Sequence, residues 1–215
     1  MADRAAVHAA LGDQMRLAVA EALIQSDRTP AWLSRELDVP SNLMAHHVNV
    51  LVTAGVVSRS VSEADRRRRY LSLTAVGHGA LGASPVLAQR VLFVCTHNSA
   101  RSQFAQALWR DRSDVPVASA GTDPAARVHP MAIRVARRNR LPLDGAEPAA
   151  LRPDMTDAAL VVSVCDNADE ELSARAHLHW SVADPARTGR RADFEAAFRM
   201  IAQRVDLLAE AVAAA

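Results

Sequence analysis

The 215-residue sequence contains no lysine, so arginine supplies all 25 of its basic side chains. Because 24 acidic residues oppose them, the formal net charge is only +1 and says little about binding partners. The positions of the arginines are therefore more informative than their number. Arg66, Arg67, Arg68 and Arg69 form the one dense cluster.

Cysteine is almost as scarce, with only Cys95 and Cys165 present. Two cysteines are too few for a disulfide framework or a cysteine-rich zinc site, so we expect no bound metal and no bound cofactor. In a reducing compartment, two isolated thiols instead favour nucleophilic or redox chemistry.

Long apolar runs are absent as well. No stretch approaches the roughly 18 consecutive apolar residues of a membrane span. The first residues also lack the basic region and apolar core of a signal peptide. We therefore expect a cytoplasmic protein with no membrane partner.

The length suits one small and one medium domain, predicted at residues 1–83 and 89–215. The first part has helical apolar spacing and helix-capping residues at Thr29-Pro30, Ser41, Gly55 and Thr74. Leu43, Val48, Leu51 and Val52 are expected to face inward. The predicted helices span 14–25, 31–37, 41–54 and 75–81, the last possibly reaching 89, and the predicted hairpin strands span 56–61 and 70–73. This order predicts an α+β winged helix-turn-helix domain.

The second part alternates buried apolar strands with helices after a short linker, Gly82 to Pro85. The predicted strands are 90–94, 115–119, 158–164 and 177–182, and the predicted helices are 101–110, 129–139 and 193–213. This alternation predicts an α/β domain with a parallel four-stranded sheet.

The clearest chemical signal lies between the first of these strands and its helix. Successive backbone N–H groups of such a loop converge on one point, and the helix start adds its positive dipole end. We expect residues of this loop to bind a tetrahedral oxyanion: Thr96, His97, Asn98, Ser99, Ala100, Arg101 and Ser102. The same field should favour the thiolate form of Cys95, a nucleophile.

Three side chains of the loop have more specific expected roles. Arg101 offers a planar fork that can hold two oxyanion oxygens. Ser102 could donate its hydroxyl to the sulfur of Cys95, and Asn98 tolerates the left-handed backbone that the loop needs.

These residues resemble the low-molecular-weight protein tyrosine phosphatase superfamily and, within it, the arsenate reductases. The resemblance covers about Arg90 to Ala213. The matching stretches are Val91 to Gln103, Ser119 to Thr122, Val161 to Cys165, His179-Trp180 and Asp184 to Ala186. His97 stands where the phosphatases usually have glycine, as in some arsenate reductases that use low-molecular-weight thiols.

The resemblance implies that Cys95 is the nucleophile, Arg101 binds the oxyanion, and Asp184 is the general acid. Taken alone, Asp184-Pro185 is more often a turn. The aromatic residues that follow this dipeptide in the phosphatases are replaced by Ala186 and Arg187. The expected substrate is therefore a small oxyanion such as arsenate or phosphate.

Cys165 stands where thioredoxin-coupled reductases carry the first of two resolving cysteines, but no second cysteine follows within 166–173. Either a Cys95–Cys165 disulfide is reduced by thioredoxin, or an external thiol such as mycothiol, with mycoredoxin, attacks the arsenic adduct. We favour the external thiol. Cys165 could also be a small buried apolar residue.

The first part resembles the ArsR-type family of homodimeric repressors over about Ala6 to Leu81, through Ala10 to Leu17 and Leu51 to Val57. The resemblance implies binding to double-stranded operator DNA. Ser41, Asn42, His46, His47 and Asn49 would face the major groove, and Arg66 to Arg69 would meet phosphates or the minor groove. The stretch where these repressors commonly carry metalloid-binding cysteines reads Glu36-Leu37-Asp38-Val39-Pro40, so no metal site is assigned.

The sequence thus predicts an arsenate reductase fused to a DNA-binding regulator of arsenic resistance. Two alternatives stay open: a repressor that senses an oxyanion without turnover, and a phosphatase acting on a small substrate.

Overall fold

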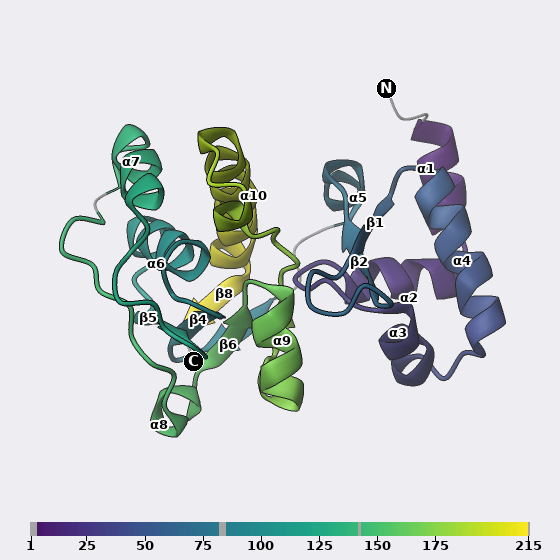
Figure 1. Ribbon diagram of the computed structural model, residues 1–215. Coiled ribbons are helices and arrows are strands. Elements are labelled where there is room, and N and C mark those ends of the chain that lie inside the picture. Colours follow the sequence, from purple (N-terminus) through teal and green to yellow (C-terminus); the bar gives the residue numbers. More distant parts are fainter. Residues whose placement is uncertain (1–3, 82–84, 142, 215) are drawn as a thin grey trace. The chain divides into compact units, whose positions relative to one another are not determined.

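The computed structural model describes residues 4–81, 85–141 and 143–214. The chain divides into two compact units, Met1–Ser84 and Pro85–Ala215, and most of their helices and strands are labelled in Figure 1. Of the predicted linker, Gly82, Ala83 and Ser84 lie outside the described residues.

The N-terminal unit consists of helices and one antiparallel hairpin. In chain order its elements are α1 (Arg4–Leu11), α2 (Gln14–Ala22), α3 (Pro30–Glu36), α4 (Ser41–Thr53), β1 (Val57–Val61), β2 (Arg69–Leu73) and α5 (Ala75–Ala80). β1 and β2 pair in register from Val57–Leu73 to Val61–Arg69, so the predicted hairpin is confirmed.

Of the three predicted N-terminal helix caps, two are present and one is not, and the predicted C-terminal cap Gly55 has the left-handed φ of 73° that ends α4. The Thr29 hydroxyl accepts from the N–H of Trp32, and the Thr74 hydroxyl accepts from the N–H of Gly77, both at 3.1 Å. Ser41, predicted as a cap, is instead the first residue of α4, and the capping position belongs to Pro40. The prediction for Ser41 was wrong because the extended backbone of Pro40 itself makes the turn into the helix.

The inward face of α4 was also only partly predicted. Val48 and Leu51 are buried, but Leu43 is 45% exposed, and Met44 and His47 take inward positions instead. Residues 44, 47, 48 and 51 follow helical spacing, so they share one face toward the core of this unit.

The C-terminal unit is an α/β structure. Its strands are β3 (Val86–Ala88), β4 (Val91–Cys95), β5 (Val117–Gly121), β6 (Leu160–Ser163), β7 (Leu178–His179) and β8 (Val212–Ala214). Its α-helices are α6 (Arg101–Arg112), α7 (Pro130–Arg138), α8 (Pro153–Thr156), α9 (Asp166–Leu172) and α10 (Arg191–Ala211), with short 3-10 turns at Ser173–Arg175 and Pro185–Arg187.

The main sheet has four parallel strands in the order β5-β4-β6-β7, which confirms the predicted α/β architecture. A second, two-stranded parallel sheet joins β3 to β8. The possible extension of a helix to residue 89 was therefore wrong, because Val86–Ala88 pair with the end of the chain instead.

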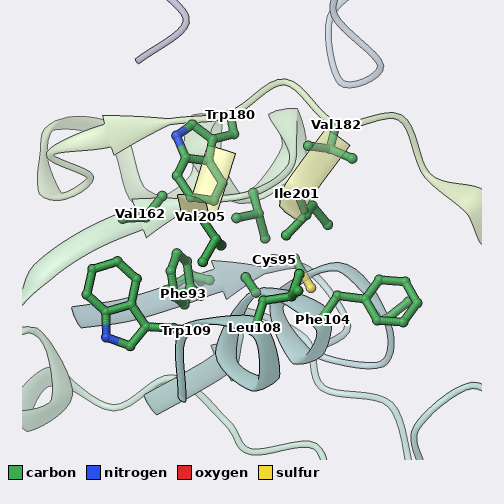
Figure 2. Close-up of a cluster of buried hydrophobic side chains, with 14 of the residues drawn as sticks. Phe93, Cys95, Phe104, Leu108, Trp109, Val162, Trp180, Val182, Ile201 and Val205 are labelled. Atoms are coloured by element: carbon green, nitrogen blue, oxygen red, sulfur yellow. The ribbon is translucent and has the colours of Figure 1, made fainter. Parts of the chain in front are cut away.

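β4 is the central structural element, since all five of its residues are buried. Phe93 packs edge-on against Trp109 of α6, with ring centroids 6.0 Å apart, and lies 5.6 Å from Trp180. Figure 2 shows these rings around β4, with Cys95 toward Phe104, on the side away from Trp109. In parallel α/β sheets, sites form where the strands end, and Cys95 is the last residue of β4.

Within the described ranges, no helix combines the length and the apolar character that spanning a bilayer requires.

Candidate active site

The loop from Cys95 to Ala100 is held from outside by the segment that follows β5. Four loop carbonyls accept backbone N–H bonds from this segment: Cys95 from Thr122 (3.2 Å), Thr96 from Asp123 (2.9 Å), His97 from Ala125 (3.0 Å) and Ser99 from His129 (2.9 Å). In a trans peptide the C=O and N–H groups point in opposite directions. The N–H groups of the same peptides therefore face the interior of the loop, where an anion would bind.

Asn98 fixes this shape. Its φ of 45° is left-handed, as expected. Its backbone N–H donates to the Cys95 sulfur at 3.2 Å, and its side-chain Nδ2 donates to the hydroxyls of Ser102 (2.7 Å) and Ser119 (2.9 Å). Its Oδ1 accepts from the Ala149 N–H at 2.9 Å. One fully buried side chain thus joins the loop to three other segments.

Gly121, at the end of β5, lies against the loop too closely for any side chain. A Cβ atom there would lie 2.6 Å from the Thr96 carbonyl oxygen and 3.1 Å from the Asn98 Cβ. The loop carbonyls can reach the segment after β5 only because this residue is glycine.

The nucleophile candidate lies at the bottom of the loop. Cys95 is buried, and its Sγ is 3.0 Å from the Ser102 Oγ. Since Ser102 belongs to the first turn of α6, the hydroxyl and the helix dipole both act on the sulfur. This arrangement places groups that can donate hydrogen bonds against the sulfur.

Arg101 and Asp184 lie together, although 83 positions separate them in the sequence. The Arg101 guanidinium is buried, donates from Nη1 to the Val182 carbonyl at 2.9 Å, and places Nη2 3.4 Å from the Asp184 Oδ1. Asp184 also caps the 3-10 turn at Pro185–Arg187 by accepting from the Ala186 N–H at 3.2 Å. A fixed cation beside a half-buried carboxyl group suits oxyanion binding with nearby proton donation.

The second thiol lies beside the same loop. The Thr96 hydroxyl is 3.5 Å from the Cys165 Sγ, and Cys165 caps α9 by accepting from the Ala168 N–H at 3.4 Å. Burial raises the pKa of the Cys165 thiol above its ordinary value of 9.0, the Arg101 charge lowers it, and Cys95 raises it further. Cys165 is therefore a protonated thiol at neutral pH unless its surroundings change.

The remaining loop residues contribute mainly backbone groups. Thr96 and Ala100 are buried, whereas the His97 side chain is 51% exposed. The His97 Nδ1 lies 2.9 Å from the Asp123 carbonyl oxygen, so the ring is turned toward the outer segment. The structure thus brings together Cys95, Asn98, Arg101, Ser102, Asp184 and Cys165.

The predicted DNA-facing residues lie in the N-terminal unit, on α4 and at the hairpin tip. Ser41, Asn42, His46 and Asn49 are exposed, as are Arg66 to Arg69. His47 differs, because its side chain is only 11% exposed and its Nδ1 lies 3.7 Å from an Asp13 carboxylate oxygen. A side chain that packs inward cannot read a base edge, so we withdraw His47 from this set.

Sequence reasoning gave no role to several residues that support the site. Ser119 accepts from Asn98, and the Gln103 Nε2 donates to both the Asn98 carbonyl and its Oδ1, each at 3.1 Å. Both residues lie in stretches that match the resembled family, which was the available signal. The backbone N–H of His129 donates to the Ser99 carbonyl. The His129 ring accepts at Nδ1 from the Met131 N–H at 3.1 Å and so caps α7.

His129 gives a prediction on pH. Burial lowers the pKa of His129 below its ordinary value of 6.5; nearby Asp184 raises it, and Arg134 and Arg127 lower it. The neutral ring accepts the capping bond and stacks on Phe194 at 4.6 Å. Because the unfolded chain binds this proton more readily, the stabilisation is complete above about pH 6.5 and is lost as the pH falls through the lower folded-state pKa.

Asparagine at position 129 retains a capping side chain but does not titrate in this range. When the pH is lowered from about 7.5 to 5, we therefore expect the Tm of His129→Asn to fall less than the Tm of the wild type. Differential scanning calorimetry of both proteins across this range measures the effect. Parallel declines in Tm would contradict it.

Comparison with known proteins assigns the C-terminal unit to a family. The family described as low molecular weight phosphotyrosine protein phosphatase matches residues 90–215, more than half of the chain, and the N-terminal unit remains unassigned. No curated protein sequence matches the chain significantly.

Solved structures of two phosphatases share the fold of this unit, and a third structure gives a weaker match. The YwlE arginine phosphatase from Geobacillus stearothermophilus is 24% identical, with a TM-score of 0.52 over 57% of this chain and 91% of its own. The tyrosine phosphatase Wzb from Escherichia coli K30, in complex with sulphate, is 22% identical, with a TM-score of 0.53 over 57% and 97%. An arsenate reductase from Archaeoglobus fulgidus is 27% identical, with a TM-score of 0.47 over 56% and 99%.

The matched residues run from the start of β4 through the Cys95–Ala100 loop to α10, and so include every residue of the candidate site. Through residues 90–215, the chain belongs to the low molecular weight phosphotyrosine protein phosphatase family.

Proposed function

We propose that the C-terminal unit reduces arsenate to arsenite. The observation that supports this reaction best is the Cys95–Ala100 loop, whose N–H groups, together with the buried Arg101, can hold a small oxyanion against the Cys95 sulfur. Reduction of the oxyanion by two electrons needs a second thiol, which an external donor can supply, with Cys165 beside the loop as an auxiliary thiol. The absence of an aromatic residue at Ala186 and Arg187 agrees with a small substrate.

In the proposed reaction, the loop N–H groups and Arg101 bind arsenate, and the Cys95 thiolate attacks arsenic. Asp184 donates a proton to the departing oxygen, which leaves as water, and a sulfur–arsenic bond remains. A second thiolate then attacks the Cys95 sulfur. The electron pair of the sulfur–arsenic bond passes to arsenic, so As(V) becomes As(III) while two thiols become a disulfide.

The test is arsenite formation from arsenate by the full-length protein, with either thioredoxin or mycothiol and mycoredoxin as the reductant. We expect turnover with at least one donor. No arsenite with either donor, together with rapid hydrolysis of para-nitrophenyl phosphate, would replace the reductase by a small-substrate phosphatase.

The role of Cys165 gives a further prediction. Because its thiol is buried and protonated, we expect an external thiol to make the second attack. Cys165→Ser should then keep arsenate turnover within a few-fold with mycothiol and mycoredoxin. If Cys165→Ser abolishes turnover with every donor, the internal disulfide route applies instead.

A second proposal concerns the N-terminal unit, which we propose binds double-stranded DNA as a winged-helix homodimer. The supporting observation is the hairpin of β1 and β2, where the exposed Arg66, Arg67 and Arg68 lie in the turn and the exposed Arg69 is the first residue of β2. Asp65 orients two of them, lying 3.0 Å from Arg67 and 3.9 Å from Arg68. On α4, Asn49 accepts from Arg59 of β1 at 2.6 Å, which connects the helix to the hairpin.

Replacing Arg66, Arg67, Arg68 and Arg69 with glutamine should weaken DNA binding uniformly across sequences. The slope of log K against log salt is negative, and each lost phosphate contact reduces its magnitude by about 0.9. We therefore expect the magnitude to fall by about 2 to 4. Fluorescence anisotropy with a labelled duplex at several salt concentrations measures this slope. An unchanged slope would remove the hairpin from the DNA interface.

The oxyanion-sensing repressor remains a distinguishable alternative. It would bind DNA in an arsenate-dependent manner and form no arsenite. The same two assays therefore separate it from the reductase.

A further inference from the structure

A second group of buried polar side chains lies beside the candidate site, where β6 leads into α9 (Figure 1). His179 of β7 is at its centre and is 2% exposed. Around its ring lie Ser163, the last residue of β6, and Asp166 and Asp169 from the first turn of α9. None of these four residues has a part in the proposed reaction.

The ring of His179 contacts all three of these side chains. Its Nε2 lies 3.2 Å from the Asp166 Oδ1, and its Nδ1 lies 2.9 Å from the Ser163 Oγ and 3.5 Å from the Asp169 Oδ1. The Ser163 hydroxyl donates its proton to that same Asp169 oxygen at 2.8 Å, so it accepts from the ring. Beside ionised carboxylates both ring nitrogens therefore carry protons, and His179 is a cation between two anions.

The burial of this cluster indicates what it contributes. Ser163, Asp166 and His179 are at most 3% exposed. The desolvation of buried charges largely offsets their attraction, so such a cluster adds little net stability. It does impose one defined geometry, because each group is satisfied only while the others are in place. The cluster therefore fixes the first turn of α9 against β6 and β7.

The position of this turn determines where Cys165 lies. Cys165 directly precedes Asp166, and its own groups begin the helix: its Sγ accepts from the Ala168 N–H at 3.4 Å, and its carbonyl accepts from the Asp169 N–H at 3.1 Å. On its other side the Sγ is 3.5 Å from the Thr96 hydroxyl. The residue is only 1% exposed. Cys165 and the first turn of α9 thus form one structural unit.

We propose that His179 is a positioning residue for Cys165. By tying the first turn of α9 to β6 and β7, it holds the thiol in the helix cap, where the thiol is shielded from solvent and accepts from the Ala168 N–H. The thiol becomes available as a nucleophile only when this turn opens. The inference rests on the proposed function, because a second thiol has a role only in that reaction. It gives a physical reason why an external thiol makes the second attack.

The test measures the accessibility of Cys165 and uses no arsenate. In the Cys95→Ser protein Cys165 is the only thiol, so iodoacetamide labels it alone, and mass spectrometry follows the rate. A buried thiol reacts only when the structure around it opens, so this rate reports the population of the open form. We expect His179→Gln in this background to raise the rate about tenfold or more, because glutamine cannot bond to Ser163 and Asp166 from opposite sides of a ring.

A general loss of stability would also raise the rate of labelling, and urea separates the two causes. Opening of one helical turn exposes little surface, so labelling through it should depend only weakly on urea below the unfolding transition. Labelling of His179→Gln that rises steeply with urea from the lowest concentrations would reveal global unfolding and would overturn the proposal.

Two further variants serve as controls in the same background. Trp109→Phe removes the bond from the Trp109 Nε1 to the Val115 carbonyl, 2.8 Å long, and so weakens the core away from α9. His177→Gln changes an exposed histidine of the same region, whose Nδ1 accepts from the Val161 N–H at 3.1 Å. Both should be labelled within about twofold of the Cys95→Ser protein. A rate in His179→Gln no higher than in these controls would overturn the proposal.

If His179→Gln does not fold, Asp169→Asn provides the test. The Asp169 side chain is 22% exposed, and asparagine keeps an acceptor for the Ser163 hydroxyl while it removes the charge beside the ring. We expect labelling about threefold faster, and an unchanged rate would overturn the proposal. Failure of the wild type to form arsenite would overturn the proposed reduction but not this placement of Cys165, so the two failures are distinguishable.

Discussion

Cys95→Ser is expected to lower arsenate turnover by about 10⁴-fold or more while the protein stays folded. Serine is nearly isosteric with cysteine, and the N–H of Asn98 and the hydroxyl of Ser102 can both bond to its oxygen. The hydroxyl is a weak nucleophile at neutral pH, and the loop's own histidine, His97, has its Nδ1 against the Asp123 carbonyl oxygen rather than against position 95. The chemical step is therefore lost, and the anion-binding N–H groups remain.

The experiment measures arsenite formation under saturating thiol, together with arsenate affinity by calorimetry and the circular dichroism spectrum. We expect lost turnover, retained affinity and an unchanged spectrum. Retained turnover would place the nucleophile elsewhere. The sensing alternative is favoured if two results occur together: arsenate changes the DNA affinity of the variant as much as that of the wild type, and the wild type forms no arsenite.

Arg101→Lys is expected to lower kcat/KM by about 10³-fold, even though the charge is kept. The buried guanidinium contacts the Val182 carbonyl with one nitrogen and Asp184 with the other. A lysine ammonium is a single point charge. It cannot bind the Val182 carbonyl, the Asp184 carboxylate and an oxyanion at the same time. The Val182 carbonyl then lacks its donor, which also costs about 1–3 kcal/mol of stability.

Steady-state kinetics and thermal denaturation measure the two effects, and Arg199→Lys, at an exposed position on α10, is the matched control. The control should match the wild type in both measurements. A wild-type kcat/KM in Arg101→Lys would show that charge alone suffices and that the fork geometry plays no part.

Local patterns predicted the parts of the fold that local residues determine. The buried run of β4, the loop from Cys95 and the start of α6 at Arg101 all follow from adjacent residues. The four-stranded parallel sheet follows from the alternation of strands and helices. Asp184 needed the family resemblance, because an Asp-Pro dipeptide carries no sign that Arg101 lies beside it.

The elements that were missed depend on distant or unusual partners. α9 was missed because residues 166–172 are mostly acidic and have no apolar stripe, and its cap is the thiol of Cys165. β3 has only three residues and exists through its pairing with β8, more than 120 positions away. His129 and Ser119 gained their roles from contacts that only the folded chain creates.

The four bonds between the catalytic-loop carbonyls and the segment after β5 also bear on the entropy of ligand binding. Because these bonds do not involve the anion, they hold the loop in shape on their own, and we expect the binding of an oxyanion to order little backbone. The main costs of binding are then the lost translational entropy of the ion and the removal of its hydration water. The same bonds predict that the proposed reaction needs no refolding of this loop between one turnover and the next.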